Sequence, residues 1–393
     1  QTTGRRMRHK GRQEVSLLSV NGRVRLRRVR WHAKDEGSET PIDALLDRAA
    51  KTFSFGVREM VCRLNLCSTS FRKTAENLGR LASIDVSGES VRQLVEQEGK
   101  QAAQQVRRGR VNPGWDASDC VTDDGKTRVY VGCDGVKVPL VTDQEKRKRR
   151  TTIKRKRQRS GKRRRALEPL QAGAADAFKE FRVVAAYDHQ QSRRIVAVTS
   201  GDCQQTGRLM RNVALAIKLP EADESIASVD GAPWIRNQLE LHQIADHINL
   251  DYYHLKDYAQ RTRREVYGEE SEEGRAWLKE LMRRFLEEDV ESAWDDLMEW
   301  RKNLRGRKRK AADRLLGYVA ERRDMIRYRE FRDRGWQIGS GPTEAQCKTT
   351  TLRLKGRGRR WDSPNAEAIM ALAAIEASGQ WNSWWATPEA TAA

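Results

Sequence analysis

Cysteine is scarce in this sequence, and the few cysteines do not form motifs. They are Cys62, Cys67, Cys120, Cys133, Cys203 and Cys347. None belongs to a C-x-x-C pair, and no histidines follow at the spacing of a zinc finger. This distribution argues against a disulfide framework and against a zinc finger, and it suits a reducing cytosol.

Long apolar runs are also missing. The sequence contains no stretch of 18 apolar residues and no apolar segment typical of a secretory signal peptide. We therefore expect a soluble protein of the cytoplasm that does not enter a membrane. The chain begins with Gln1 rather than methionine, so we expect the natural N-terminus to lie upstream. No G-x-x-x-x-G-K-[ST] motif occurs, which leaves nucleotide hydrolysis without support.

Acidic residues are few compared with basic ones. The 393 residues include 76 Lys and Arg but only 55 Asp and Glu, which gives a formal charge of +21. Such an excess creates an attractive field around a polyanion, so nucleic acid is the first partner to expect. The length allows two or three domains and a sizeable core.

The N-terminal part reads as a β-hairpin. Residues 14–31 carry two runs with alternating apolar positions around Asn21-Gly22, the strongest short hairpin signal. The second run is rich in arginine, so it could lie along a phosphate backbone. An ordinary small β element with a charged outer face explains the pattern equally well.

A cluster of short helices follows the hairpin. The apolar spacing predicts helices over 57–66, 71–81 and about 91–104, the last one entered through Ser87 or Ser90. The tight connection between the last two helices is typical of a helix-turn-helix, with residues 88–100 as the recognition helix. A plain helical bundle has the same pattern, so both interpretations stay open.

From about residue 126 the apolar period becomes that of strands. Strands are expected near 128–133, 136–141, 181–187, 194–199 and 225–229, and helices near 204–217 and 233–247. This order predicts an α/β fold with a mixed sheet. Apolar positions of helical period over 269–300 and 311–330 predict an all-α block inserted before the end of that fold.

A dense basic block interrupts the predicted sheet. Residues 146–165 contain 14 Lys or Arg and no acid. Such a segment cannot pack into a core and repels itself when free, so we expect a loop that orders only against phosphates. A solvated linker is the alternative, but a linker is not expected inside a hairpin of a sheet.

Three acidic residues stand where strands or helices begin or end. Asp134 and Asp230 follow predicted strands, and Glu344 lies in the first turn of a helix that Pro342 can open. Singly, each has an ordinary explanation as a turn or a helix-dipole residue. Together they can converge at one edge of a sheet and supply the oxygen ligands that two magnesium ions need. Asp188, in "YDHQQ", is a rival ligand.

These residues also carry a resemblance to a known family. The stretches "YVGCDGVKVP", "VDGAPWIRNQL", "NLDYYHLKDYA" and "WQIGSGPTEAQCKTTTLRLKGRGRRW" resemble successive blocks of ISKra-group bacterial insertion-sequence transposases, relatives of the Mutator-like DDE transposases. The resemblance covers most of the chain up to Trp361. It implies an RNase H-like catalytic domain interrupted by an all-α insertion.

The resemblance also implies a set of site residues. The catalytic and metal-binding triad falls on Asp134, Asp230 and Glu344, which would hold two Mg²⁺ ions, with Mn²⁺ able to substitute. The family's C/D-x-x-H signature falls on Asp251 and His254. These two residues would orient the scissile phosphate or hold the insertion against the sheet.

The sequence departs from the family in three places. "RWHAKDEGSETPID" has no cysteine where relatives often carry a zinc-binding stretch, so we expect no zinc there. Arg359 stands where the family usually has methionine before its Arg-Trp pair. The basic block is longer than expected for the family. These departures concern recognition of DNA ends more than chemistry.

DNA contacts are expected from two basic segments, the block 146–165 and the stretch 352–361, "LRLKGRGRRW". The second segment adds Trp361 as a stacking platform for a base, although an exposed basic loop is its plain alternative. The expected DNA-binding residues are Arg147, Arg149, Arg150, Lys154, Arg155, Arg157, Arg163, Arg164, Arg353, Lys355, Arg357, Arg359, Arg360 and Trp361.

The expected domain organisation follows from these segments. It comprises a basic hairpin region (1–45), a helix-turn-helix-like DNA-binding domain (46–112), the first part of the RNase H-like domain with its basic loop 146–165 (126–252), the all-α insertion (253–335), the last part of the RNase H-like domain (336–385) and a tail (386–393).

The predicted function is that of a DNA transposase that cleaves and joins the ends of an insertion sequence by a two-metal mechanism. Its partners would be double-stranded transposon ends and target DNA, bound by a homodimer or larger assembly in the cytoplasm, at the nucleoid. The alternatives are a non-catalytic DNA-binding protein derived from a transposase and a plain metal-dependent nuclease.

Overall fold

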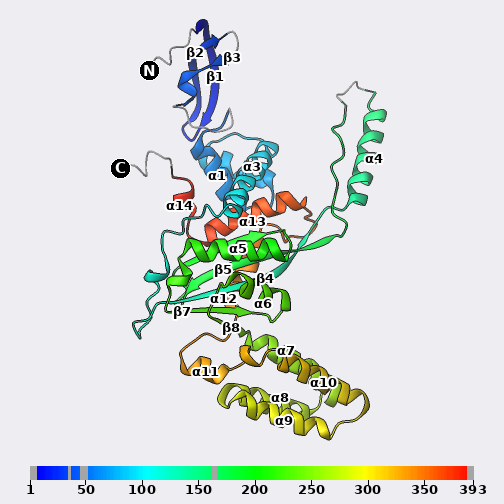
Figure 1. Ribbon diagram of the computed structural model, residues 1–393. Coiled ribbons are helices and arrows are strands. Elements are labelled where there is room, and N and C mark those ends of the chain that lie inside the picture. Colours follow the sequence, from blue (N-terminus) through cyan, green and yellow to red (C-terminus); the bar gives the residue numbers. More distant parts are fainter. Residues whose placement is uncertain (1–6, 34–36, 45–51, 162–165, 387–393) are drawn as a thin grey trace.

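The computed structural model describes residues 7–33, 37–44, 52–161 and 166–386 (Figure 1). At one end lies a ribbon formed by β1 (Arg8–Ser19), β2 (Gly22–Ala33) and β3 (Gly37–Glu39). Ser19 pairs with Gly22 across the turn at Asn21-Gly22, and Gly22 has a φ of 105° that favours glycine. The predicted hairpin is confirmed, and both of its strands are longer than expected.

Three helices follow the ribbon, as predicted. They are α1 (Phe55–Cys67), α2 (Phe71–Ala82) and α3 (Gly88–Arg107). Each begins at a serine whose side chain accepts a backbone N–H of the first turn: Ser54, Ser70 and Ser87. Of the two expected caps of the third helix, Ser87 is the one the structure uses.

A five-stranded mixed sheet forms the centre of the molecule, in the order β6-β5-β4-β7-β8. The strands are β4 (Arg128–Pro139), β5 (Phe178–Asp188), β6 (Arg194–Thr199), β7 (Glu224–Val229) and β8 (His247–Leu250). Strands β4 and β6 run antiparallel to β5, which lies between them, whereas β7 is parallel to β4 and β8 is parallel to β7. The predicted mixed α/β fold is confirmed at this level.

Two details of the predicted sheet are wrong. The expected strands 128–133 and 136–141 are one strand, β4, and Asp134 lies inside it rather than at a corner. The reason is that β5 pairs with β4 without interruption through Asp134 and Gly135, so no turn forms. The helix expected over 233–247 ends at His242, which leaves room for β8.

Helices cover both faces of the sheet. On one face lie α5 (Cys203–Ala216) and α6 (Pro233–His242), which share a core with Val129 and Val131 of β4. On the other lie α12 (Gly341–Thr351) and α13 (Ser363–Ala377), with α1 to α3 packed on the outer side of α13 and with the short α14 (Trp381–Trp384) nearby. Val136 and Val138 of β4 belong to this second core.

An all-helical block lies at the end of the molecule away from the ribbon (Figure 1). It contains α7 (Tyr252–Tyr267), α8 (Glu272–Glu287), α9 (Val290–Lys302), α10 (Gly306–Ala320) and α11 (Tyr328–Asp333). The predicted all-α block is thereby confirmed. Its chain leaves the sheet directly after β8 and returns at α12.

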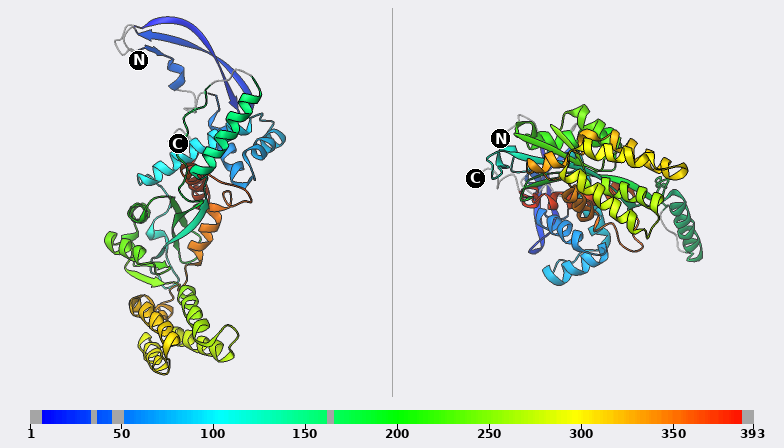
Figure 2. Two further views of the ribbon diagram at one scale, coloured as in Figure 1. Left: turned by 90° about the vertical axis from the view of Figure 1, so that its right-hand side faces the viewer. Right: turned by 90° about the horizontal axis from the view of Figure 1, so that it is seen from below.

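Residues 146–159 of the basic block belong to a helix rather than to the expected loop. Helix α4 (Asp143–Arg159) starts with a reciprocal capping box between Thr142 and Glu145. It stands away from the rest of the molecule, as the views in Figures 1 and 2 agree, and it has no buried residue. The prediction of a loop was wrong because no apolar face marks this helix in the sequence. Its two acids, both in the first turn, favour the helix N-terminus.

Candidate active site and nucleic-acid interface

Asp134 lies in β4, and Asp230 directly follows the neighbouring strand β7. The ladder between β4 and β7 pairs Val129 with Ser225 and Val131 with Ala227, and the same separation in sequence relates Asp134 to Asp230. Level residues of paired strands point to the same face of a sheet. The same register, continued three residues beyond the last pair of Val131 with Ala227, places the two carboxylates on one face.

Helix α12 covers this face beside Asp134. A Cβ added at Gly132, two residues before Asp134, would lie only 2.0 Å from Oγ1 of Thr343. Only glycine therefore allows α12 to approach the strand so closely. Cys347, one turn further along α12, lies next to Asp134: burial, then the charge of Asp134 and a hydrogen bond with it, raise the pKa of the Cys347 thiol.

The charges of both aspartates affect the pKa of a second thiol, that of Cys133. Burial raises the pKa of Cys133 first, and the negative charges of Asp134 and Asp230 raise it further. Both carboxylates are thus close enough to act on the same side chain. Asp134 accepts the N–H of the next strand residue, Gly135, at 2.6 Å, and Asp230 accepts the Ala232 N–H at 2.9 Å.

Glu344 lies in the first turn of α12, next to Thr343. Its Oε1 atom accepts a hydrogen bond from Ser340 Oγ at 3.2 Å and lies 3.8 Å from Nε2 of His254. Both side chains are partly exposed to solvent. The structure therefore brings Glu344 and His254 together at the start of α7.

Asp251 continues the same row of acids but is fully engaged. The ladder between β7 and β8 pairs Val229 with Leu250, so Asp251 lies level with Asp230. Its Oδ1 atom accepts the N–H groups of Tyr253 (2.6 Å) and His254 (3.2 Å), and its Oδ2 atom accepts the Ser340 hydroxyl (2.6 Å) and the Ser340 N–H. These bonds tie β8, α7 and α12 together, which favours the holding role over contact with a phosphate.

Arg322 fixes the turn that carries Asp230. Its Nε and Nη2 atoms donate to the carbonyl oxygen of Gly231 at 3.1 and 2.9 Å, and its guanidinium lies 4.1 Å from the centre of the Tyr318 ring. Gly231 has a φ of 81°, and a Cβ there would lie 2.6 Å from a methyl group of Leu250. The sequence analysis missed Arg322, because only the fold brings it to this turn.

The donor set suits magnesium in its chemistry, since Asp134, Asp230 and Glu344 all offer carboxylate oxygens. Among the described residues, however, no group of three or more His, Cys, Asp or Glu side chains is gathered closely enough to hold a metal ion. The metal ligands therefore stay a prediction. Asp188 is no rival ligand of Asp134, because it lies level with Val129 near the other end of β4.

The basic residues of the arm are mostly accessible. Here the arm means α4 together with the returning segment 166–177. Arg147, Arg149, Lys154 and Arg155 are exposed, whereas Arg150 and Arg157 are half-buried. Arg163 and Arg164, which were also expected to contact DNA, lie outside the described residues.

The prediction for the stretch 352–361 needs correction. Arg353 and Trp361 are only 4% and 9% exposed, and the Arg353 guanidinium lies 5.1 Å from the ring centres of both Phe71 and Trp361. Burial, then the charge of Arg359, lowers the pKa of Arg353 to about 10. Trp361 is therefore no open stacking platform, and the two side chains join the N-terminal helices to the sheet.

The other basic residues of this stretch remain near the surface. Lys355 and Arg357 are exposed, and Arg359 donates from Nη1 to the carbonyl oxygen of Arg353 at 2.8 Å. Arg360 is exposed and forms an ion pair with Glu145 at 3.3 Å. Contact of Lys355 and Arg357 with DNA therefore stays a prediction.

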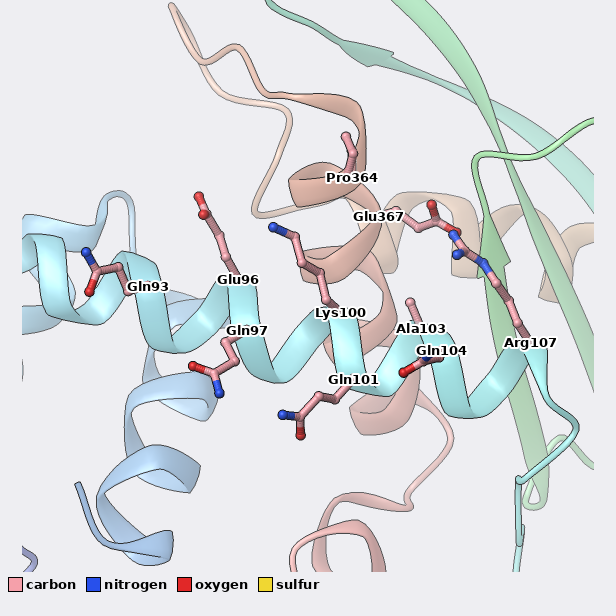
Figure 3. A pocket seen from close by; sticks show the side chains of 10 residues that line it. All are labelled: Gln93, Glu96, Gln97, Lys100, Gln101, Ala103, Gln104, Arg107, Pro364 and Glu367. Carbon is pink, nitrogen blue, oxygen red and sulfur yellow. The ribbon is translucent and has the colours of Figure 1, made fainter. Parts of the chain in front are cut away.

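A groove of about 610 Å³ is lined by residues of α3 and α13 (Figure 3). Its lining includes Gln93, Gln97, Gln101 and Gln104, which are exposed along one side of α3. Glutamine side chains can read base edges in a major groove. The recurrence of glutamine at intervals of three or four residues was the signal in the sequence that could have found this feature.

Comparisons with known proteins give little. No family model matches the sequence, and no curated protein matches it. A chain of the Drosophila P element transposase strand transfer complex resembles this structure over 85% of this chain and 81% of that chain, with 10% sequence identity and a TM-score of 0.28. A TM-score this low establishes neither a shared fold nor a shared function. No helix in the described part of the chain is long and apolar enough to cross a membrane.

Proposed function

We propose that this chain is a DDE transposase that cleaves DNA at the ends of its element and joins them to a target. The observation that carries the proposal is the level placement of Asp134 and Asp230 on the face that α12, with Glu344, covers. The strand order supports the RNase H-like arrangement implied by the resemblance, since an antiparallel meander lies on one side of β4 and two parallel strands on the other.

The three carboxylates would hold two magnesium ions. Bound there, the ions would supply charge neutralisation and an activated oxygen nucleophile for phosphoryl transfer. The chain's own residues would position these ligands: Arg322 through the carbonyl of Gly231, and Asp251 through Ser340 at the start of α12. Preorganised ligands matter because reaction rates fall steeply when reacting groups are misplaced by about 1 Å.

The location of the basic elements supports a DNA substrate. The N-terminal helices pack on α13, which lies on the same face of the sheet as the carboxylates. The arm continues directly from the strand that carries Asp134. DNA bound to these elements would approach the carboxylates from that face.

The first test is cleavage of a supercoiled plasmid in the presence of Mg²⁺. The plasmid carries the natural DNA on both sides of this gene, which contains the ends of the element. We expect Asp134→Asn and Asp230→Asn each to lower the cleavage rate at least about 100-fold, since each removes charge from the site of phosphoryl transfer. Asp257→Asn, at an exposed acid on α7, is the matched control and should cleave like wild type.

Two outcomes would replace the proposal. Wild-type protein that binds DNA but cleaves no better than Asp134→Asn would be a non-catalytic DNA-binding protein. Wild-type protein that cleaves but never joins a 3′-hydroxyl end to target DNA would be a metal-dependent nuclease. Detection of joined products by sequencing across the new junctions supports the transposase.

A further inference from the structure

Helix α4 concentrates positive charge on a surface that is only partly neutralised by the described chain. Its two acids, Asp143 and Glu145, both lie in the first turn, and the helix has no buried residue. Beyond the first turn every charged side chain is a Lys or an Arg. A helix of this composition repels itself, so it gains stability from a polyanion rather than from its own protein.

One side of α4 faces the returning segment of the arm. Arg150 donates to the carbonyl oxygen of Glu168 at 2.6 Å, and Lys146 donates to that of Ala172 at 2.9 Å. Ile153 lines a hollow together with Leu167 and Leu170. This side holds the arm together, so its cations are already engaged.

The opposite side of α4 is different. Arg147, Thr151, Arg155 and Arg159 are exposed at intervals of four residues, and they form one stripe on a helix. Lys148 and Lys156 flank this stripe. Within the described part of the chain none of these five cations forms an ion pair with an acid, and the views in Figures 1 and 2 show no other element over α4. We call this side the outer face of α4.

We propose that the outer face of α4 lies in the major groove of duplex DNA beside the cleavage point and holds the DNA by its phosphates. The B-DNA major groove is about 12 Å wide, and a helix with its side chains is about 10–12 Å across. The major groove of A-form RNA is too deep and narrow for a helix. A membrane surface does not fit either, because the outer face carries no apolar stripe.

The base of the arm is fixed to the body, so this grip has a defined reach. Val141 N–H donates to the carbonyl oxygen of Trp361 at 2.9 Å, which attaches the arm to the body, and Asp143 N–H donates to that of Ala174 at 3.1 Å, which joins the two sides of the arm at its base. Lys146 also pairs with Asp362 at 2.5 Å. The chain from Asp134 to Arg155 spans at most about 50 Å, which equals about 15 base pairs of DNA.

The test is DNA binding without chemistry, measured by fluorescence anisotropy on a duplex of about 30 base pairs in EDTA. The arm variant replaces Arg147, Arg155 and Arg159 by glutamine. The control variant removes three equally exposed charges from α10 by changing Arg307, Lys308 and Lys310 to glutamine. Both variants should melt like wild type, because none of the changed side chains is buried.

We expect the arm variant to lose at least about 10-fold in affinity at physiological salt, and its plot of log K against log salt to flatten by about 2.7, or about 0.9 for each lost phosphate contact. The loss should be similar for duplexes of any sequence. The control should keep both values, and duplex RNA should compete poorly. Unchanged affinity and salt slope in the arm variant, or an equal loss in the control, would overturn the proposal.

Only the position of the grip relative to the cleavage point rests on the proposed function. It is checked by attaching a crosslinker at position 155 through Arg155→Cys and mapping the crosslinked base relative to the cut, which should lie within about 15 base pairs. Crosslinks farther from the cut would contradict the proposed position of α4 relative to the cleavage point. Because affinity is measured in EDTA, a chain that never cleaves DNA leaves the binding result intact, and a failed grip leaves the cleavage test intact.

Discussion

Helices α4 and α13 have similar lengths and opposite surroundings. In α13 every residue from Ala366 to Ile375 is buried, whereas α4 has no buried residue at all. A helix that is apolar all round belongs in a core, and one that is polar all round needs another source of stability. Helix α13 lies between the sheet and the N-terminal helices, whereas α4 offers its surface to a partner.

The comparison teaches where stability and function reside in this chain. Contacts of α13 join α3 to strand β6 and so connect the two ends of the sequence. The arm contributes charge and reach but no core. Substitutions in α13 should therefore affect folding, whereas substitutions in α4 should affect binding.

The largest effect is expected from a charge placed in α13. Leu372 is fully buried, so Leu372→Asp should destabilise the chain by more than about 4 kcal/mol, through a lost apolar contact and an unpaired buried carboxylate. Thr152→Asp on the exposed side of α4 should change stability by less than about 0.5 kcal/mol. Thermal melts followed by circular dichroism compare the two, and equal losses would contradict the distinction between the helices.

The next effect concerns the buried ion pair beneath α3. Arg58 Nη1 lies 2.7 Å from Glu98 Oε1, and both side chains are less than 10% exposed. Glu98→Ala should cost about 3–5 kcal/mol, because it leaves the Arg58 charge buried without this partner. Urea denaturation measures the loss. The double variant Arg58→Met with Glu98→Leu should recover part of it, and a double variant as unstable as the single one would refute this explanation.

A smaller effect is expected where α3 and α13 touch. A Cβ added at Gly99 would lie 2.3 Å from the carbonyl oxygen of Ala368, so Gly99→Ala should destabilise by about 1–3 kcal/mol. Gly79 on α2 has open space around it, and Gly79→Ala should stabilise by about 0.5–1 kcal/mol. Opposite shifts in the denaturation midpoint are the expected result. A destabilising Gly79→Ala would weaken the steric argument.

The smallest free energies should appear in hydrogen exchange of α4. Its amides should open at a cost of only about 0–2 kcal/mol, whereas those of α13 should require an opening close to global unfolding. Mass spectrometry of exchanged peptides covers both helices in one experiment. Addition of duplex DNA should slow exchange in α4 and leave α13 unchanged, and protection of α4 without DNA as strong as that of α13 would break the comparison.

The spacing of apolar residues in the sequence predicted most of the helices and strands well. Strand β6 (Arg194–Thr199) begins and ends where expected, because a short continuous run of apolar residues is bounded by polar segments. The N-terminal helices were found through serine caps and helical spacing. Strand β4 was wrongly predicted as two strands, because Asp134-Gly135 has the composition of a turn. Only pairing with β5 keeps these two residues extended.

The candidate site was predictable in its residues but not in their roles. Asp134 and Asp230 were found as acids near strand ends, yet their level placement depends on the pairing of strands far apart in sequence. Arg353 and Trp361 looked like surface groups, because a sequence does not tell which cation will be buried over aromatic rings. Two of the four hydrogen bonds to Asp251 come from Ser340, 89 residues away.

Because the base of the arm is fixed to the body, the length of the arm can change independently of the positions of the acids. Whole turns could be added to or removed from the far end of α4 during evolution without altering the seam between β4 and β7. Relatives with short and long arms could thus share one arrangement of acids and yet differ in how much flanking DNA they cover.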